Sequence, residues 1–311
     1  MTTYYLLRAG SAISRVVPLA VLYALAGLAA RLVALLPTAG RAAARANIAR
    51  VLGQAPESLA VRRAAARAMR YQALNYVDMV RIDRVSEPEC DATVVRGDLS
   101  PLFDCLAEGK GAIIVSAHLG NMDYVVQWLG LHGIPVHSLM ERLEPERLNR
   151  LVVSQRKGAG LYIDPIGPQA LPRLTRLLRE GKLVALLCDR DIGGTGEPVC
   201  FFGREARLPV GPVLLALRTG APLVPSFGRR LRDNRLYVTV KPPIYLQRTR
   251  DLRADLREGL RALARALEDG IADAPDQWIV FAPIWPDADA VQRAPAPAPD
   301  VSTESSKDGA A

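Results

Sequence analysis

One of the chain's three histidines stands where loops carry chemistry in α/β proteins. His118 follows an expected strand at residues 113–116, and Asp123 begins a segment with helical spacing five positions later. Reactive groups in open α/β sheets collect at the carboxyl ends of strands. A carboxylate there can accept one imidazole N–H and fix the tautomer, which leaves the other ring nitrogen as a base. The alternative is an ordinary loop histidine beside an acidic first turn of a helix.

Two more aspartates follow a second apolar run. Asp189 and Asp191 come directly after residues 183–188, so we expect them at the same edge of the sheet. Arg190 lies between them, and a local salt-bridge cluster is the alternative to a role in substrate binding. Two acids at this spacing also suggest a metal, but no histidine or third acid has matching spacing. The sequence therefore leaves substrate contacts and a local salt-bridge cluster both open for Asp189 and Asp191, and it argues against a metal.

Alternating strands and helices are expected to position these loops. Short apolar runs predict buried strands, and apolar residues repeating every three to four positions predict helices. The expected strands span residues 111–116, 135–140, 161–163, 183–188, 223–227 and 236–241. The expected helices span residues 123–131, 145–157, 168–179, 211–219 and 251–271. This alternation predicts an α/β fold with a central, mainly parallel or mixed sheet flanked by helices.

The first forty residues have a different character. Residues 16–30 carry no charge, and this stretch is shorter than the ~20 apolar residues of a transmembrane helix. Three interpretations stay open: a helix lying in the membrane interface, a buried or hairpin-forming core helix, and a cleaved signal peptide. We expect a membrane-associating helix within residues 1–40, an α/β domain over 41–288, and a disordered tail rich in Ala, Pro and Ser over 289–311.

The composition points to an anionic partner. The net charge is +8, and residues 41–70 hold seven arginines against one acid, Glu57, in an Ala-rich helical stretch. Such a face attracts anionic lipid headgroups, although a solvated helix face has the same pattern. Aromatic residues make up 5% of the chain, too few for base-stacking platforms, so lipid is favoured over nucleic acid. Four cysteines without CxxC spacing argue against a zinc ribbon or disulfide framework and fit a reducing compartment.

A wider set of motifs accompanies the His-x4-Asp loop. They are RANIAR at 45–50, HLGNMD at 118–123, Glu141, Arg156, DRD at 189–191, FFG at 201–203, LPVGPVLLALRTGAP at 208–222, QW at 277–278 and PIWP at 283–286. Over about residues 5–287 the chain resembles the lipid A biosynthesis acyltransferase family, which includes the mycobacterial phosphatidylinositol mannoside acyltransferases. That branch is the nearer one because its loop has the form His-Leu-x-Asn-x-Asp. It usually carries Pro and Trp where this chain has Gly120 and Met122, which leaves the acceptor open.

The resemblance implies a glycerolipid-acyltransferase-like fold and a reaction that needs no cofactor. Acyl-CoA or acyl carrier protein would give its acyl group to a hydroxyl of a glycolipid. His118 would be the general base, Asp123 would orient it, and Glu197 would be an acid supplied by a downstream loop. An exposed loop acid is the alternative for Glu197. The residues implied in substrate binding are Glu141, Arg156, Asp189, Asp191, Arg207 and Arg218, of which the arginines suit phosphates.

The leading interpretation is thus an O-acyltransferase at the cytoplasmic face of the plasma (inner) membrane, with a phosphatidylinositol mannoside as acceptor. A lipid A precursor is the alternative acceptor. An interpretation of another class is a non-enzymatic protein that binds anionic lipids through the arginine-rich helices, and then His118→Ala would leave the function intact. A lipid esterase is disfavoured because the chain has no Gly-x-Ser-x-Gly elbow.

Overall fold

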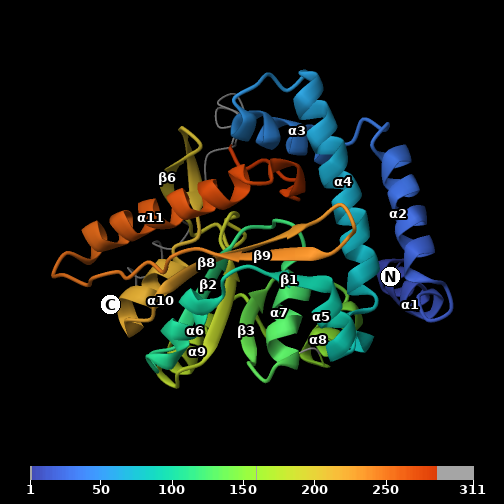
Figure 1. Ribbon diagram of the computed structural model, residues 1–311. Helices are drawn as coiled ribbons and strands as arrows, with labels where there is room; N and C mark the ends of the chain where they lie inside the picture. The colour runs from blue at the N-terminus through green and yellow to red at the C-terminus, as the bar shows by residue number, and fades with distance from the viewer. Residues whose placement is uncertain (1, 159, 286–311) are drawn as a thin grey trace, which may run out of the picture.

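A seven-stranded sheet forms the centre of the computed structural model, which describes residues 2–158 and 160–285 (Figure 1). The strand order is β1-β9-β8-β2-β5-β3-β4. Strands β8, β2, β5, β3 and β4 run parallel to one another, whereas β9 runs antiparallel to β8 and carries β1 parallel to itself. The predicted α/β fold with a mainly parallel, mixed sheet is confirmed, and the predicted tail over 289–311 lies outside the described residues.

The elements have the following bounds. The sheet strands are β1 Val94–Arg96, β2 Ala112–Ser116, β3 Val136–Met140, β4 Leu161–Pro165, β5 Leu183–Leu187, β8 Leu223–Arg230 and β9 Leu236–Val240, and a separate hairpin pairs β6 Glu197–Phe201 with β7 Arg204–Leu208. The α-helices are α1 Thr2–Ile13, α2 Leu19–Val33, α3 Ala39–Leu52, α4 Leu59–Met79, α5 Glu87–Thr93, α6 Ser100–Ala107, α7 Met122–Leu131, α8 Glu146–Gly158, α9 Ala170–Arg179, α10 Gly211–Thr219 and α11 Leu252–Ala272. Two 3₁₀ turns, η1 Ile82–Arg84 and η2 Pro275–Gln277, complete the list.

Strand β2 lies in the middle of the sheet and is buried along its whole length. Successive side chains of a strand point to opposite faces, so Ile113 and Val115 pack into the core formed with α9, α10 and α11. Ile114 faces the other way and packs with apolar side chains of α5, α6 and α7. Coverage on both faces explains why this strand reads as a continuous apolar run rather than an alternating one.

The N-terminal region is two helices rather than the one that the apolar run suggested. Pro18 directly precedes α2 as its N-cap residue. Helix α2 packs along α4 (Figure 1), and its Gly27 and Ala30 are buried. Large apolar side chains on α2, including Leu25, Leu28 and Leu32, are exposed. Among the described residues, no helix combines the length and apolar character needed to cross a membrane.

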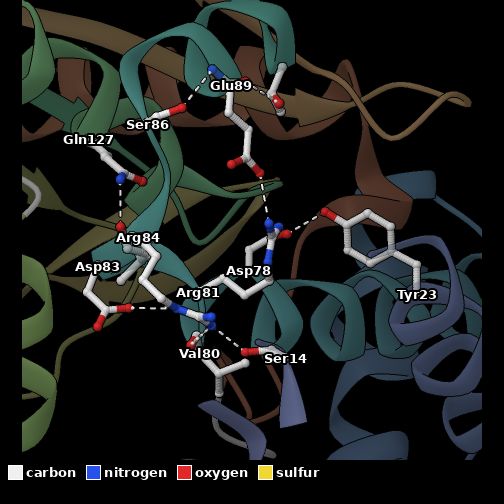
Figure 2. Close-up of polar contacts among 12 residues, drawn as sticks. Ser14, Tyr23, Asp78, Val80, Arg81, Asp83, Arg84, Ser86, Glu89 and Gln127 are labelled. Carbon is white, nitrogen blue, oxygen red and sulfur yellow. Dashed lines mark hydrogen bonds and ion pairs between the residues drawn. The ribbon is translucent and has the colours of Figure 1, made fainter. Parts of the chain in front are cut away.

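Polar contacts join the N-terminal region to the end of α4 and to the turn that follows it, as Figure 2 shows. The hydroxyl of Tyr23 on α2 donates to Asp78, in the last turn of α4. Arg84, in the turn that follows α4, donates to the hydroxyl of Ser14, next to α1. The end of α4 and the turn after it are therefore in contact with α2 and with the residue that follows α1.

Candidate active site

The loop between β2 and α7 carries His118, and the loop after β5 carries Asp189. Strands β2 and β5 pair in parallel with Ser116 opposite Leu187, the last residue of each strand. His118 and Asp189 each lie two positions beyond that pair. The register of the two strands therefore places the two side chains side by side at the carboxyl edge of the sheet.

Asp189 contacts both the ring and the backbone of His118. Its Oδ1 lies 2.7 Å from His118 Nδ1, and its Oδ2 accepts the His118 backbone N–H at 2.9 Å. Oδ2 also accepts the indole N–H of Trp278 at 2.7 Å. Asp189 is fully buried, whereas 24% of the His118 side chain is exposed. A buried carboxylate accepts the Nδ1 proton in this arrangement, and the Nε2 lone pair has no partner among the described residues.

The two groups stabilise each other's charged forms. Burial by itself lowers the pKa of His118, but the charge and hydrogen bond of Asp189 raise that pKa above its ordinary value. Burial raises the pKa of Asp189, and the charge of His118 together with the hydrogen bonds from His118 and Trp278 brings it below the usual range of an aspartate. The positive charge of Arg190 acts in the opposite direction and lowers the pKa of His118. The pair can thus hold an imidazolium once Nε2 has taken a proton.

The C-terminal segment completes the loop. The Ile279 N–H donates to the His118 carbonyl at 2.8 Å, and the Gly120 N–H donates to the Gln277 carbonyl at 3.1 Å. Gly120 has φ +58°, and a Cβ at this position would lie 2.0 Å from the carbonyl oxygen of Gly228 on β8. Only glycine fits between these backbones, which fixes the path of the loop on both sides.

Sequence comparison with known proteins is consistent with this geometry. A sequence model of the bacterial lipid A biosynthesis acyltransferases matches residues 1–286. The chain belongs to this family. A phosphatidylinositol mannoside acyltransferase of Mycobacterium tuberculosis is 30% identical over 249 residues, which is 78% of this chain and 76% of that protein. The Mycolicibacterium smegmatis protein of the same name is 29% identical over 247 residues, 78% of each chain. The resemblance inferred from the motifs is confirmed.

The expectation that Asp123 orients His118 is corrected by the acyltransferase structure. Asp123 is the second residue of α7, and it pairs with Arg156 of α8 instead. The carboxylate that contacts the ring is Asp189. Asp123 adds only a minor electrostatic contribution that raises the pKa of His118. The first turn of α7 faces α8, whereas the register of β2 and β5 brings Asp189 to the ring.

The Asp123–Arg156 pair still borders the site. Arg156 lies in the last turn of α8, and its side chain also contacts the sulfur of Met140, the last residue of β3, at 3.0 Å. Glu141 follows β3 directly and is exposed. The structure therefore brings the expected residues Glu141 and Arg156 to the carboxyl edge that holds His118, because β3 is a parallel neighbour of β5.

Four other expected site residues have separate positions. Asp191 accepts the Gly196 N–H at 2.9 Å and closes the glycine-rich loop after β5. Glu197 and Arg207 are exposed on the β6–β7 hairpin. Arg218 is exposed in the last turn of α10, the helix that precedes β8. The carboxyl end of such a helix lies near the start of the next strand, so Arg218 is at the edge opposite to His118 and apart from this site.

The polar role of Trp278, in the QW motif at 277–278, was not predicted. Trp278 is buried, and its indole N–H donates to Asp189. A buried tryptophan usually finds a hydrogen-bond acceptor for its indole N–H, so an acid expected in the core was the residue to test as its partner. Asn121, whose side chain caps α7 and reaches Asp78, was also missed.

Proposed function

We propose that this acyltransferase moves a fatty acyl group from an acyl thioester to a hydroxyl of a phosphatidylinositol-mannoside-type glycolipid, with His118 as the general base. The observation that carries the proposal is the bond between His118 Nδ1 and the buried Asp189, which leaves Nε2 uncommitted and partly exposed. The names of the mycobacterial relatives support the acceptor class. Acyl-CoA or acyl carrier protein would be a co-substrate, and no cofactor is required.

In the proposed reaction, Nε2 of His118 accepts the proton of the acceptor hydroxyl. At the same time the hydroxyl oxygen forms a bond to the thioester carbonyl carbon. The tetrahedral intermediate then collapses, the C–S bond breaks, and the leaving thiolate takes up the proton from His118. General-base assistance of this kind contributes about 10²–10⁴-fold to a rate. The negative charge of Asp189 stabilises the imidazolium that forms between the two proton transfers.

The N-terminal helices support association with a membrane surface. Exposed apolar side chains cover one side of α2 and continue beyond it to Leu35, which is 75% exposed. Tyr23 contacts Asp78 and Gly27 lies beside Arg70, so α2 runs antiparallel to α4 and its end lies near the beginning of α4. Arg62 and Arg63, near the beginning of α4, are exposed. Arginines in this position can bind anionic headgroups beside an inserted apolar face. We propose docking at the cytoplasmic face of the plasma membrane.

The reaction is tested with purified protein and palmitoyl-CoA. One reaction contains deacylated mannosyl-phosphatidylinositol, another contains a lipid A precursor, and the products are identified by mass spectrometry beside His118→Ala. An acylated mannoside that is absent with the variant supports the proposal. An acylated lipid A precursor alone would transfer the proposal to the other acceptor. No product with either acceptor, or with acyl carrier protein as donor, would favour the non-enzymatic lipid-binding interpretation.

Membrane docking is tested separately by vesicle sedimentation. Leu28→Asp places a charge in the exposed face of α2 and removes an apolar contact, so we expect about tenfold weaker binding to anionic vesicles. Leu252→Asp, at an exposed leucine that begins α11, is the matched control and should bind like the wild type. Equal binding by both variants would exclude α2 as the docking face.

A further inference from the structure

A buried ion pair lies behind the active-site loop. Asp78 at the end of α4 and Arg230 at the end of β8 pair with side chains that are 3% and 1% exposed. Removing two charges from water is costly, so a buried ion pair is weak support for stability alone. Such pairs can instead fix one arrangement of the elements that they join. The partners of this pair show which elements those are.

Asp78 accepts hydrogen bonds from three separate parts of the chain. The amide of Asn121, in the loop that carries His118, donates to Asp78 Oδ2 at 2.7 Å. The Arg230 guanidinium donates to the same oxygen, and the hydroxyl of Tyr23 donates to Oδ1. Burial and the charge of Asp78 raise the pKa of Tyr23, so this hydroxyl keeps its proton and acts as a donor. Asp78 therefore joins α2, β8 and the active-site loop.

The loop is held at two successive residues by this network. Asn121 uses both ends of its amide, because its Oδ1 accepts the Tyr124 N–H at 3.3 Å and caps α7. Asn75, one turn before Asp78, donates to the Gly120 carbonyl at 2.5 Å and accepts from Arg230 at 3.0 Å. The position of the loop backbone, and hence of the His118 ring, thus depends on where α4 and Asp78 lie.

Through Tyr23, the position of the active-site loop also depends on α2. Its side chain reaches Asp78 from the face of α2 that packs on α4, as Figure 2 shows, and the guanidinium of Arg230 lies over its ring at 5.5 Å. Other residues of the same helix, Leu25, Leu28 and Leu32, are exposed and apolar. A single helix therefore offers one face to the solvent and, through one hydroxyl, contacts the carboxylate that holds the active-site loop.

We propose that Asp78 is a positioning residue for His118, and that Tyr23 makes this positioning depend on the placement of α2. The role in turnover rests on the proposed acyl transfer. When α2 is displaced from α4, Asp78 loses the Tyr23 hydroxyl and the hold on Asn121 loosens. A membrane that seats α2 against α4 would keep the network complete and the loop in its catalytic position.

Tyr23→Phe tests the link with little risk to the fold, since it removes one hydroxyl and keeps the ring. Coupling between residues through a contiguous network amounts to about 2- to 30-fold in an equilibrium or rate. We expect kcat to fall by this factor while KM and vesicle binding stay unchanged. Tyr76→Phe is the matched control, because this exposed tyrosine of α4 has no hydrogen bond among the described residues. Wild-type kcat in folded Tyr23→Phe would overturn the role of Tyr23.

Asn121→Ser is the second variant. Serine keeps a good N-cap for α7 but is too short to reach Asp78, so kcat should fall at least as far as in Tyr23→Phe. A loss of kcat in Tyr23→Phe that disappears at saturating vesicle concentration would mean weaker docking alone, and would also overturn the positioning role.

The imidazole resonances give a readout that needs no turnover. The chain has three histidines, so His118 can be assigned in ¹H–¹³C spectra by comparison with His118→Ala. We expect its chemical shift and titration to change in Tyr23→Phe and Asn121→Ser but not in Tyr76→Phe. An unchanged His118 signal in Asn121→Ser would overturn the proposal. Absence of turnover in the wild type would contradict the proposed function instead, and the spectra would still decide the positioning role.

Discussion

Replacing Asp189 with asparagine tests the arrangement of the site most directly. Asparagine has the same shape, and its carbonyl oxygen can still accept the Trp278 and His118 backbone N–H groups that Oδ2 now accepts at 2.7 and 2.9 Å. The amide –NH₂ would then face His118 Nδ1 in place of the oxygen that lies at 2.7 Å. Nδ1 must accept this hydrogen bond, so the single ring proton moves to Nε2. The imidazole can no longer act as a base there.

The expected loss is large because the tautomer and the charge are lost together. The equivalent change in a Ser-His-Asp triad lowers kcat about 10⁴-fold with the geometry intact. We expect about 10³–10⁴-fold here, which corresponds to ~4–5.5 kcal/mol of transition-state stabilisation. Asp104→Asn, at an exposed residue of α6, is the control and should leave kcat unchanged.

The pH dependence of the rate tests the direction in which Asp189 shifts the pKa of His118. Asp189 raises the pKa of His118 above its ordinary value, so kcat/KM of the wild type should rise as the pH passes through that raised pKa. Without the negative charge, the pKa of His118 falls and the residual activity should appear at lower pH. Steady-state rates from pH 5 to 9 and an NMR titration of His118 measure both effects. Activity within tenfold of the wild type, or an unchanged pKa of His118, would refute the assignment of Asp189.

Two further substitutions test the surroundings of the pair. Gly120→Ala puts a Cβ 2.0 Å from the Gly228 carbonyl oxygen at a φ of +58°, so urea denaturation should show a loss of about 3 kcal/mol or more; Gly133→Ala, with φ +76° and open space, should lose only about 1–2 kcal/mol. Trp278→Phe removes a hydrogen bond that lowers the pKa of Asp189, so it should cost about 1.5–3 kcal/mol near neutral pH. A group with a depressed pKa stabilises the fold above its unfolded pKa and loses this effect as the pH falls, so acid unfolding of Trp278→Phe should begin at higher pH; an unchanged acid transition would argue against the Trp278 hydrogen bond.

The strands at the centre of the sheet could be predicted from the sequence because they are buried on both faces. Runs such as residues 112–115 and 183–187 are apolar throughout, and helices with a clear apolar stripe separate them. Strand β1 has only three residues, and the β6–β7 hairpin is interrupted by charged residues, so neither produced a recognisable pattern. Helix α1 was not predicted, because Thr2, Arg8 and Ser11 interrupt its apolar character.

The site was predicted in part. His118 was correctly placed beyond the end of a strand, but its partner was sought in the nearest acid along the chain. Asp189 is 71 positions away and becomes a neighbour only through the pairing of β2 with β5. Strand order is not encoded in any local pattern, so the sequence alone could not choose between Asp123 and Asp189. The available signal was that His118 and Asp189 lie the same number of positions beyond the ends of two buried runs.

The hydrogen bonds between residues 277–279 and the His118 loop have a consequence for how the protein is made. The ribosome releases the chain from its N-terminus, so the strand that leads to His118 is synthesised long before Ile279 and Gln277. The loop therefore acquires its final backbone partners only when synthesis has passed nearly all of the described residues. A nascent or prematurely terminated chain that already exposes its apolar N-terminal helices would carry His118 in an incomplete site, and under the proposed docking it would reach a membrane before it can act on a lipid.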